Sequence, residues 1–339
     1  MIYYVFLTVA ALLFALQFII TKAYQRINDD GIFSTLSLSF LAYCVIAAFF
    51  FVKACLTHQK VVFGFSLFTL AMTAGVAVVT LLCVYCGIKV LAVGDTSVYS
   101  VFMMSGSMAL PCLTGIIFYN EPVGILKGVA VVLMLAAVLC SGLPVGGKRN
   151  GSKKAFAYYA AVFVLNGLIG VLFTVHQNSP ELTAYYAVID GKAVTDSDIF
   201  MCWYGISTAV ITGCVWAALK VVKQRGRRQI GSEQSELVAA ADQPAADKKL
   251  NADKKLKRIV LSAGLAVCYG LFNGTGNYFI AIGTGPDGLG ASVTFPVVNG
   301  GCILFSALIG ALVYKEKISL RTAAGLLLVI TATVLFMFS

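Results

Sequence analysis

Eight polar side chains lie inside long apolar runs, and their types could do chemistry there. They are Gln17, Ser97, Tyr99, Asn166, Asn273, Asn277, Thr294 and Asn299. Each of these side chains offers both a hydrogen-bond donor and an acceptor. Together they could hold a neutral or zwitterionic solute by hydrogen bonds. The alternative is that each side chain only bonds one helix to its neighbour, as polar groups in lipid commonly do.

The densest polar cluster is the segment Asn273-Gly274-Thr275-Gly276-Asn277. Its two amides stand among glycines, which expose backbone groups. Gly270 and Gly274 also form a G-x-x-x-G pattern, which is typical of a face where two helices pack closely. We therefore expect this segment to line a solute pathway or to form a close helix contact.

Two carboxylates, Glu121 and Glu316, each follow an apolar run and lie in a short polar turn. One interpretation is that they carry protons. Because each lies at a helix end, the pattern favours a structural role, in which the carboxylate caps the free N–H groups of the next helix. All fifteen Asp and Glu residues lie in loops or at helix ends. This disfavours exchange of protons for cationic drugs, which usually relies on a carboxylate within the membrane.

The elements that must position these side chains are long uncharged runs. Apolar residues make up 59% of the 339 residues, charged residues make up 12%, and the mean hydropathy is +0.89. A soluble domain is typically about 45–50% apolar and about 25% charged. Runs of roughly 20 apolar residues span a bilayer as helices, and they are too long for barrel strands. The pattern predicts an all-α polytopic membrane protein with ten transmembrane helices, at Ile2–Lys22, Ile32–Ala54, Phe65–Ile88, Thr96–Phe118, Val123–Cys140, Ala155–Val175, Ile199–Val222, Ile259–Ile282, Leu289–Val313 and Ile318–Phe338.

The basic residues predict how the chain is oriented. If the chain crosses the membrane ten times, 21 of its 25 Lys and Arg residues lie in loops on one side. Loops rich in Lys and Arg remain in the cytoplasm, so both chain ends are expected outside. The net charge of +10 then reflects topology, and nucleic acid is not expected as a partner. Basic linkers are expected inside at 143–154 and 223–258, and a polar segment is expected outside at 178–198. The 223–258 linker is expected to be mostly disordered, with Leu250–Lys257 as an alternative extension of the following helix.

The hairpin near the C-terminus repeats the stretch Val93–Cys140 at an offset of 195 positions. The shift aligns Ser97, Gly106, Gly115, Tyr119 and Glu121 with Ser292, Gly301, Gly310, Tyr314 and Glu316. The first repeat is expected at 1–142 and the second at 155–339. With five spans in each repeat, the second enters the membrane inverted, which is an architecture of secondary transporters.

Two hairpin motifs carry a resemblance to a known family. They are Gly115-Ile116-Ile117-Phe118-Tyr119-Asn120-Glu121-Pro122 with Gly128, and Gly310-Ala311-Leu312-Val313-Tyr314-Lys315-Glu316 with Gly325. With the layout of five plus five spans, they resemble the EamA-type transporters of the drug/metabolite transporter (DMT) superfamily. The resemblance implies two inverted five-helix EamA-like repeats, a central pathway between them and a place in the bacterial plasma membrane. The segments 178–198 and 223–258 are longer than the family pattern.

The function that follows is secondary transport of a small organic metabolite, such as an amino acid, a nucleoside or a sugar, by alternating access. A multidrug or amine exporter of the same superfamily is one alternative. Small multidrug exporters use a glutamate in their first helix, where this chain has Gln17. A non-transporting membrane sensor or scaffold that uses the basic linker is another alternative.

Other patterns favour no further chemistry. An enzyme of lipid or cell-wall chemistry would gather histidines and acids at one interface, but the only histidines are His58 and His176. We interpret His176 as an interfacial anchor, with a pathway entrance as the alternative. Cys83-x-x-Cys86 is interpreted as apolar filler in a span, and Gly283-Thr284-Gly285-Pro286-Asp287-Gly288 as a turn, because a nucleotide site needs a preceding strand. No cofactor or metal is expected. The expected partners are the solute and the bilayer, with a homodimer left open.

Overall fold

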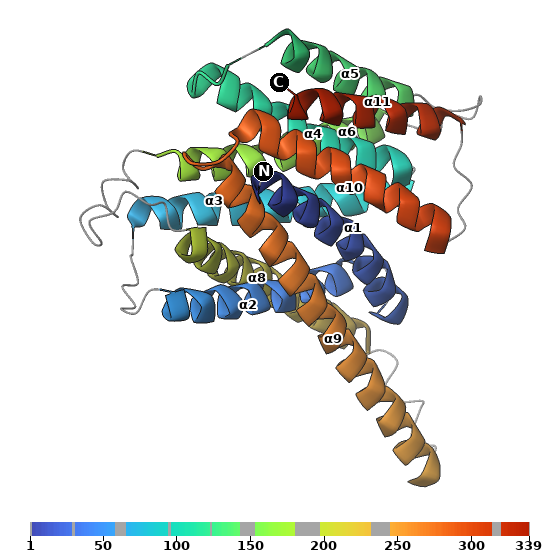
Figure 1. The fold of residues 1–339 in the computed structure, drawn as a ribbon. Helices are drawn as coiled ribbons and strands as arrows, with labels where there is room; N and C mark the ends of the chain where they lie inside the picture. The colour runs from blue at the N-terminus through green and yellow to red at the C-terminus, as the bar shows by residue number, and fades with distance from the viewer. Residues whose placement is uncertain are drawn as a thin grey trace.

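A computed structural model describes residues 2–28, 31–57, 66–93, 96–122, 124–142, 153–179, 197–231, 245–313 and 320–338. Within these ranges the chain forms helices and turns, without a β-strand. The helices are α1 (Ile2–Asn28), α2 (Ile32–Thr57), α3 (Leu67–Val93), α4 (Thr96–Phe118), α5 (Ile125–Gly142), α6 (Lys153–Gln177), α8 (Ser197–Gly231), α9 (Ala245–Thr284), α10 (Ala291–Val313) and α11 (Leu320–Met337). Each predicted apolar run overlaps one of these helices, which form a bundle (Figure 1).

Several of these helices are long and apolar enough to cross a membrane. Six segments meet this description: Ile2–Asn28, Ile32–Leu56, Leu67–Gly87, Phe156–Gln177, Ser197–Arg225 and Leu256–Thr284. Shorter apolar stretches occur in α4, α10 and α11. Large apolar side chains such as Leu82, Val132 and Val210 are exposed on the outside of the bundle. An apolar exterior is what a lipid environment requires, so the chain is an all-α protein with the helices of a multi-pass membrane protein.

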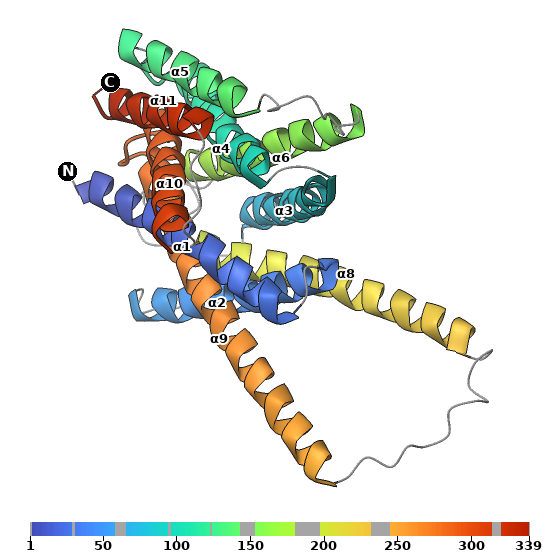
Figure 2. The same cartoon turned by 90° about the vertical axis from the view of Figure 1, so that its right-hand side faces the viewer.

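The helices pack in a regular pattern. α1 packs against α9 and α10, and α6 packs against α3 and α4. α1 and α9 run antiparallel, because Gln17 contacts Tyr269 while Asn28 contacts Ser262. α5 and α11 lie together on one side of the bundle, and α2 and α8 lie together on the opposite side (Figures 1 and 2).

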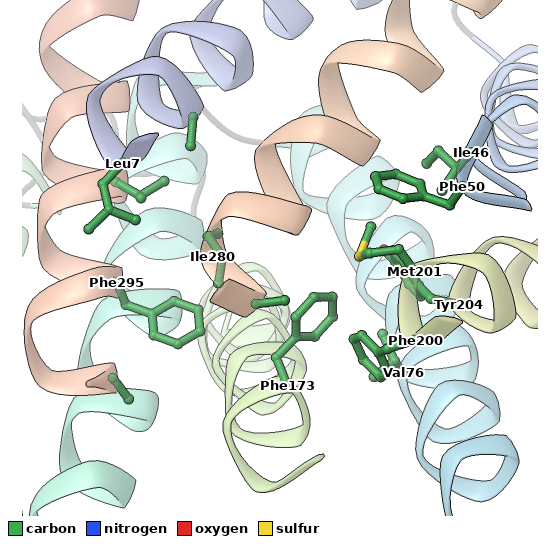
Figure 3. Packing of buried hydrophobic residues seen from close by; sticks show 14 of the residues in the cluster. Leu7, Ile46, Phe50, Val76, Phe173, Phe200, Met201, Tyr204, Ile280 and Phe295 are labelled. Carbon is green, nitrogen blue, oxygen red and sulfur yellow. The ribbon is translucent and has the colours of Figure 1, made fainter. Parts of the chain in front are cut away.

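The largest apolar cluster lies where α1, α2, α3, α6, α8, α9 and α10 meet. Figure 3 shows side chains from these helices pointing toward one another. Phe173 of α6 meets Phe200 of α8 edge-on, with ring centroids 4.9 Å apart, and it also meets Tyr204 edge-on at 5.5 Å. Edge-to-face contacts of this kind stabilise aromatic pairs beyond their buried area. The cluster therefore joins helices from the beginning and the end of the chain.

Much of the linker at 223–258, which was expected to be mostly disordered, is helical. α8 continues to Gly231 and α9 begins at Ala245, so helix occupies most of this segment. Lys, Arg, Ala, Gln and Leu are good helix formers, and here they extend helices that already exist inside the bundle. Figure 2 shows both helices projecting beyond the bundle at the same end. Residues 232–244 lie outside the described residues.

Most of the other two expected polar segments also lies outside the described residues. α5 ends at Gly142 and α6 begins at Lys153, so the described residues include only the last two positions of the 143–154 linker. For the segment expected at 178–198, the structure describes the two ends. Residues 178 and 179 follow α6, and Asp198 lies in the first turn of α8. Asp198 is therefore a helical residue rather than a loop residue.

Two glycines allow helices to approach closely. A Cβ on Gly106 of α4 would lie 2.0 Å from the backbone oxygen of Phe163 in α6. A Cβ on Gly301 of α10 would lie 2.8 Å from the Cβ of Ala11 in α1. Both helix pairs would have to separate to admit a larger residue. Gly270 of α9 is likewise in close contact, with Ala42 of α2, as its G-x-x-x-G pattern predicts.

Gly106→Ala is expected to lower the free energy of unfolding by about 2 kcal/mol, because the α6 backbone must move to admit the methyl group. Gly128→Ala is the matched control. A Cβ on Gly128 would meet nothing within 4 Å, and alanine favours a helix over glycine. Thermal unfolding of the purified variants measures the difference. Equal stability of the two variants would contradict the close approach of α4 and α6.

Candidate functional site

Four side chains of α1 and α9 form a hydrogen-bonded chain, which we call the polar ladder. Gln17 Nε2 donates to the Tyr269 hydroxyl at 2.6 Å, and Asn273 Nδ2 donates to Gln17 Oε1 at 3.1 Å. Asn277 Nδ2 donates to Asn273 Oδ1 at 3.2 Å. Residues four apart share one face of a helix, so Tyr269, Asn273 and Asn277 form a single polar stripe on α9. All four groups of the ladder are uncharged amides or hydroxyls.

Further tyrosines lie beside the polar ladder. The hydroxyls of Tyr43 in α2 and Tyr204 in α8 are 2.8 Å apart, and their rings meet at 80°. Both tyrosines, and Tyr99 of α4, lie close enough to Tyr269 to interact with it electrostatically. The Tyr43–Tyr204 pair joins α2 to α8, and the Tyr99 hydroxyl faces Gly87 of α3.

The structure brings together some of the side chains selected from the sequence. Gln17, Asn273 and Asn277 form most of the polar ladder. Tyr99 packs instead among side chains of α3 and α6. Tyr43, Tyr204 and Tyr269 were missed. Each of these three tyrosines lies within an apolar run, as Tyr99 does, so the same criterion that selects Tyr99 would also select them.

The remaining predicted residues lie elsewhere. Asn166 Nδ2 of α6 donates to the Met103 carbonyl oxygen of α4 at 2.7 Å, which links the two helices. Asn299 bonds within its own helix, to the carbonyl oxygen of Phe295 at 3.0 Å. The Thr294 hydroxyl is buried and has no hydrogen-bond partner within the described part of the chain. The side chain of Ser97, like the whole of Glu316, lies outside the described residues.

An ion pair joins α2 and α8 near the Asn277 end of the polar ladder; the Lys53 side chain is 32% exposed, and only Asp198 is buried. Lys53 Nζ is paired with Asp198 Oδ1, and Asp198 is only 4% exposed. Lys53 Nζ also donates to the Tyr278 hydroxyl at 2.9 Å and lies 4.1 Å from the centre of that ring. Tyr278 follows Asn277 in α9. We call Lys53, Asp198 and Tyr278 the charged cluster. The sequence placed Lys53 and Asp198 on the same side of the membrane but did not pair them.

Glu121 caps a helix in the other half of the chain. Its carboxylate accepts hydrogen bonds from the backbone N–H groups of Ala291 at 2.8 Å and Ser292 at 3.0 Å. These residues begin α10, so Glu121 caps α10. The sequence predicted instead that Glu121 would cap the helix that follows it in the chain. The contact is tight: Gly290 has φ +79°, and a Cβ there would lie 2.8 Å from Glu121 Cδ. The positive end of the α10 dipole favours the carboxylate at this position.

Lys127 strengthens the same junction. It is 4% exposed, and its Nζ donates to the Ser292 hydroxyl at 3.0 Å. The turn that carries Glu121 is shaped by Asn120, which adopts a left-handed backbone with φ 51°. Asn is one of the few residue types other than glycine that tolerates this region. The α4–α5 hairpin is therefore attached to the start of α10 by three hydrogen bonds.

His176 is buried, so its interpretation as an interfacial anchor is wrong. Only 1% of it is exposed, and its ring stacks between Phe68 and Phe200. The Gln177 amide nitrogen lies 3.3 Å from Nδ1, and the Thr69 hydroxyl lies 3.1 Å from Nε2. If Gln177 donates to Nδ1, Nε2 carries the proton and donates to Thr69. His176 therefore links α6 to α3 and α8.

The two ends of the bundle differ in the polar contacts described between their helices. The end that holds Glu121, Lys53 and His176, which we call the Glu121 end, has polar contacts that reach α2, α3, α6, α8, α9 and α10. At the opposite Asn28 end, Asn28 donates to the Ser262 hydroxyl at 2.7 Å. The hydrogen bonds described between helices at the Asn28 end link α1 to α2 and α9. Among the described residues, polar contacts therefore connect more helices at the Glu121 end.

Comparison with known proteins adds information on the fold. No protein-family model matches the chain, and no curated protein matches it. Among solved structures 28 chains match. One, described only as "Crystal structure of protein", aligns over 99% of this chain and 97% of its own with a TM-score of 0.63 and 9% identity. The likeness shows that this helix arrangement exists in a solved protein of similar extent.

Proposed function

We propose that this protein is a secondary transporter that moves a small neutral or zwitterionic organic solute across a membrane by alternating access. The observation that carries the proposal is the polar ladder, a row of uncharged hydrogen-bonding groups inside a bundle with an apolar exterior. Buried polar groups are costly in a membrane unless they are satisfied, and they mark solute pathways. The ladder groups offer donors and acceptors without a net charge, which suits a solute that carries no net charge.

Two inverted five-helix repeats, with ten transmembrane helices, form the scaffold of the proposed transporter. The packing pattern supports this: if α1 corresponds to α6, then its contacts with α9 and α10 correspond to those of α6 with α3 and α4. Gly106 and Gly301, aligned by the offset of 195, each lie where the fourth helix of one half meets the first helix of the other. The hairpin motifs favour an EamA-type member of the DMT superfamily, in the bacterial plasma membrane with both termini outside.

The charges of the described residues favour a metabolite over a cationic drug. Asp198 is a buried carboxylate, but it is paired with Lys53 and so offers no unbalanced negative charge to a cation. The groups of the polar ladder are all neutral. An amine exporter would require a carboxylate that faces the pathway and gives up its proton in each cycle.

A thermal-shift screen of the purified protein against amino acids, nucleosides, sugars and amines tests the proposal. A ligand that binds the folded state alone raises the unfolding temperature by mass action. At least one neutral or zwitterionic solute is expected to stabilise the wild type and to have no effect on Gln17→Leu. Stabilisation by amines alone would favour the exporter alternative, and the absence of any stabilising solute would favour a sensor or scaffold.

A further inference from the structure

The charged cluster connects three helices at the Glu121 end. Lys53 lies near the end of α2, Asp198 in the first turn of α8, and Tyr278 on α9 beside the polar ladder. Lys53 holds the three helices together, because it pairs with Asp198 and donates to the Tyr278 hydroxyl. Phe50 of α2 adds a ring contact with Tyr278, with centroids 5.4 Å apart. These helices come from different halves of the chain.

The opposite ends of α2 and α8 are joined by other chemistry. There Phe40 stacks on Trp216 with an interplanar angle of 3°, and Lys223 Nζ lies 4.6 Å from the Phe33 ring centre. These are contacts of aromatic rings, whereas the contact at the Glu121 end involves the buried carboxylate of Asp198, which Lys53 neutralises. Removing one partner of a buried pair leaves a charge without compensation, which strongly disfavours that state. Separating Lys53 from Asp198 would leave this buried carboxylate without its partner, so the contact favours the closed arrangement of α2 and α8 at the Glu121 end.

On the basis of the proposed transport function, we propose that Lys53 and Asp198, with Tyr278, form the gate that closes the Glu121 end of the solute pathway. When one half of the chain rotates against the other, Lys53 on α2 separates from Asp198 and Tyr278, and the polar ladder becomes accessible from that end. The three residues are positioning residues. They set which conformation is populated and do not bind the solute.

A native cysteine, Cys202, can be used to measure opening of this gate. Cys202 lies four residues after Asp198, one turn deeper in α8, and is 3% exposed. Its thiol faces α2, because Sγ lies 3.7 Å from the Ala47 carbonyl oxygen. Opening the gate would expose this thiol to water from the Glu121 end alone. A variant that keeps Cys202 and replaces the other nine cysteines by serine or alanine allows its rate of reaction to be measured.

The experiment measures labelling of Cys202 by a membrane-impermeant thiosulfonate, applied to each face of oriented vesicles. Lys53→Met and Asp198→Asn are each expected to raise the labelling rate from the Glu121 side about tenfold, because an open state of a few per cent becomes a major state. Tyr278→Phe, which removes one hydroxyl, is expected to have a smaller effect in the same direction. The exchanged pair Lys53→Asp with Asp198→Lys is expected to return the rate to within about twofold of the parent.

Asn28→Ala is the matched control, since it removes a polar contact between helices at the opposite end. It is expected to leave labelling from the Glu121 side unchanged. Unaltered labelling in Lys53→Met and Asp198→Asn, with thermal unfolding showing both variants folded, overturns the gate. Faster labelling that the exchanged pair does not reverse also overturns it, because that result indicates general loosening. These outcomes are independent of transport, so a failure to find any transported solute would count against the proposed function and not against the gate.

Discussion

Replacement of Gln17 by leucine is expected to lower the initial rate of transport at low substrate concentration by about tenfold or more. Gln17 connects both branches of the polar ladder, because it donates to Tyr269 and accepts from Asn273. Leucine has a similar size but can make neither bond. In the proposed pathway the solute takes over these bonds to Gln17, so leucine removes up to two neutral hydrogen bonds to the solute. These are worth about 1–3 kcal/mol, and each 1.4 kcal/mol changes affinity tenfold. The measurement is uptake into proteoliposomes at equal protein density, with thermal unfolding of the same samples.

Asn166→Leu is the control for this prediction. Asn166 is also an amide that links two helices, but it bonds to the Met103 carbonyl oxygen between α6 and α4. Its loss is expected to lower stability by about 1 kcal/mol and to leave the KM for the solute unchanged. A larger fall in transport for Asn166→Leu than for Gln17→Leu would place the pathway on the α4–α6 side and contradict the role of the ladder.

Replacement of Glu121 by alanine is expected to cause the largest loss of stability among single changes at the polar sites. The carboxylate holds two N–H groups at the start of α10, and hydrogen bonds to charged groups are worth about 1.5–3 kcal/mol each. Because Glu121 is only partly buried, the low end of this range applies to both bonds, and with the lost helix-dipole interaction the free energy of unfolding should fall by about 3–4 kcal/mol. Glu121→Gln retains one acceptor and should lose about half as much. Thermal unfolding in detergent ranks the two variants against the wild type.

The proposed inverted repeat extends this prediction to the second hairpin. Glu316 corresponds to Glu121 at the offset of 195, so Glu316→Ala should destabilise the protein to a similar degree. A stable Glu316→Ala variant beside an unstable Glu121→Ala variant would show that the two hairpins are not equivalent. Wild-type stability of Glu121→Ala would contradict the α10 cap itself.

The helices could be located from the sequence because the signal is local. A run of about 20 apolar residues predicts a spanning helix without knowledge of its neighbours. The amides Gln17, Asn273 and Asn277 were also found, because a polar side chain inside an apolar run stands out by type. Their connection was not found, since nothing in the sequence says that α1 lies against α9.

The contacts that were missed all depend on how distant helices pack. Glu121 was recognised as a capping residue, but its target begins 170 positions later, at Ala291. Lys53 and Asp198 were assigned to ordinary helix ends, because charge patterns give the side of the membrane and not the partner. His176 was placed at the surface, since polarity alone does not show that two aromatic rings cover it.

The measurement that tests the transport function most directly is solute counterflow in proteoliposomes. Vesicles that contain wild-type protein and a high concentration of one unlabelled solute are diluted into a trace of the labelled solute. The expected result is transient accumulation of label for at least one neutral or zwitterionic metabolite with wild-type protein, and an initial rate about tenfold or more lower with Gln17→Leu. Label that enters no faster than in protein-free vesicles, across amino acids, nucleosides, sugars and amines, would contradict a transporter with its pathway at the polar ladder.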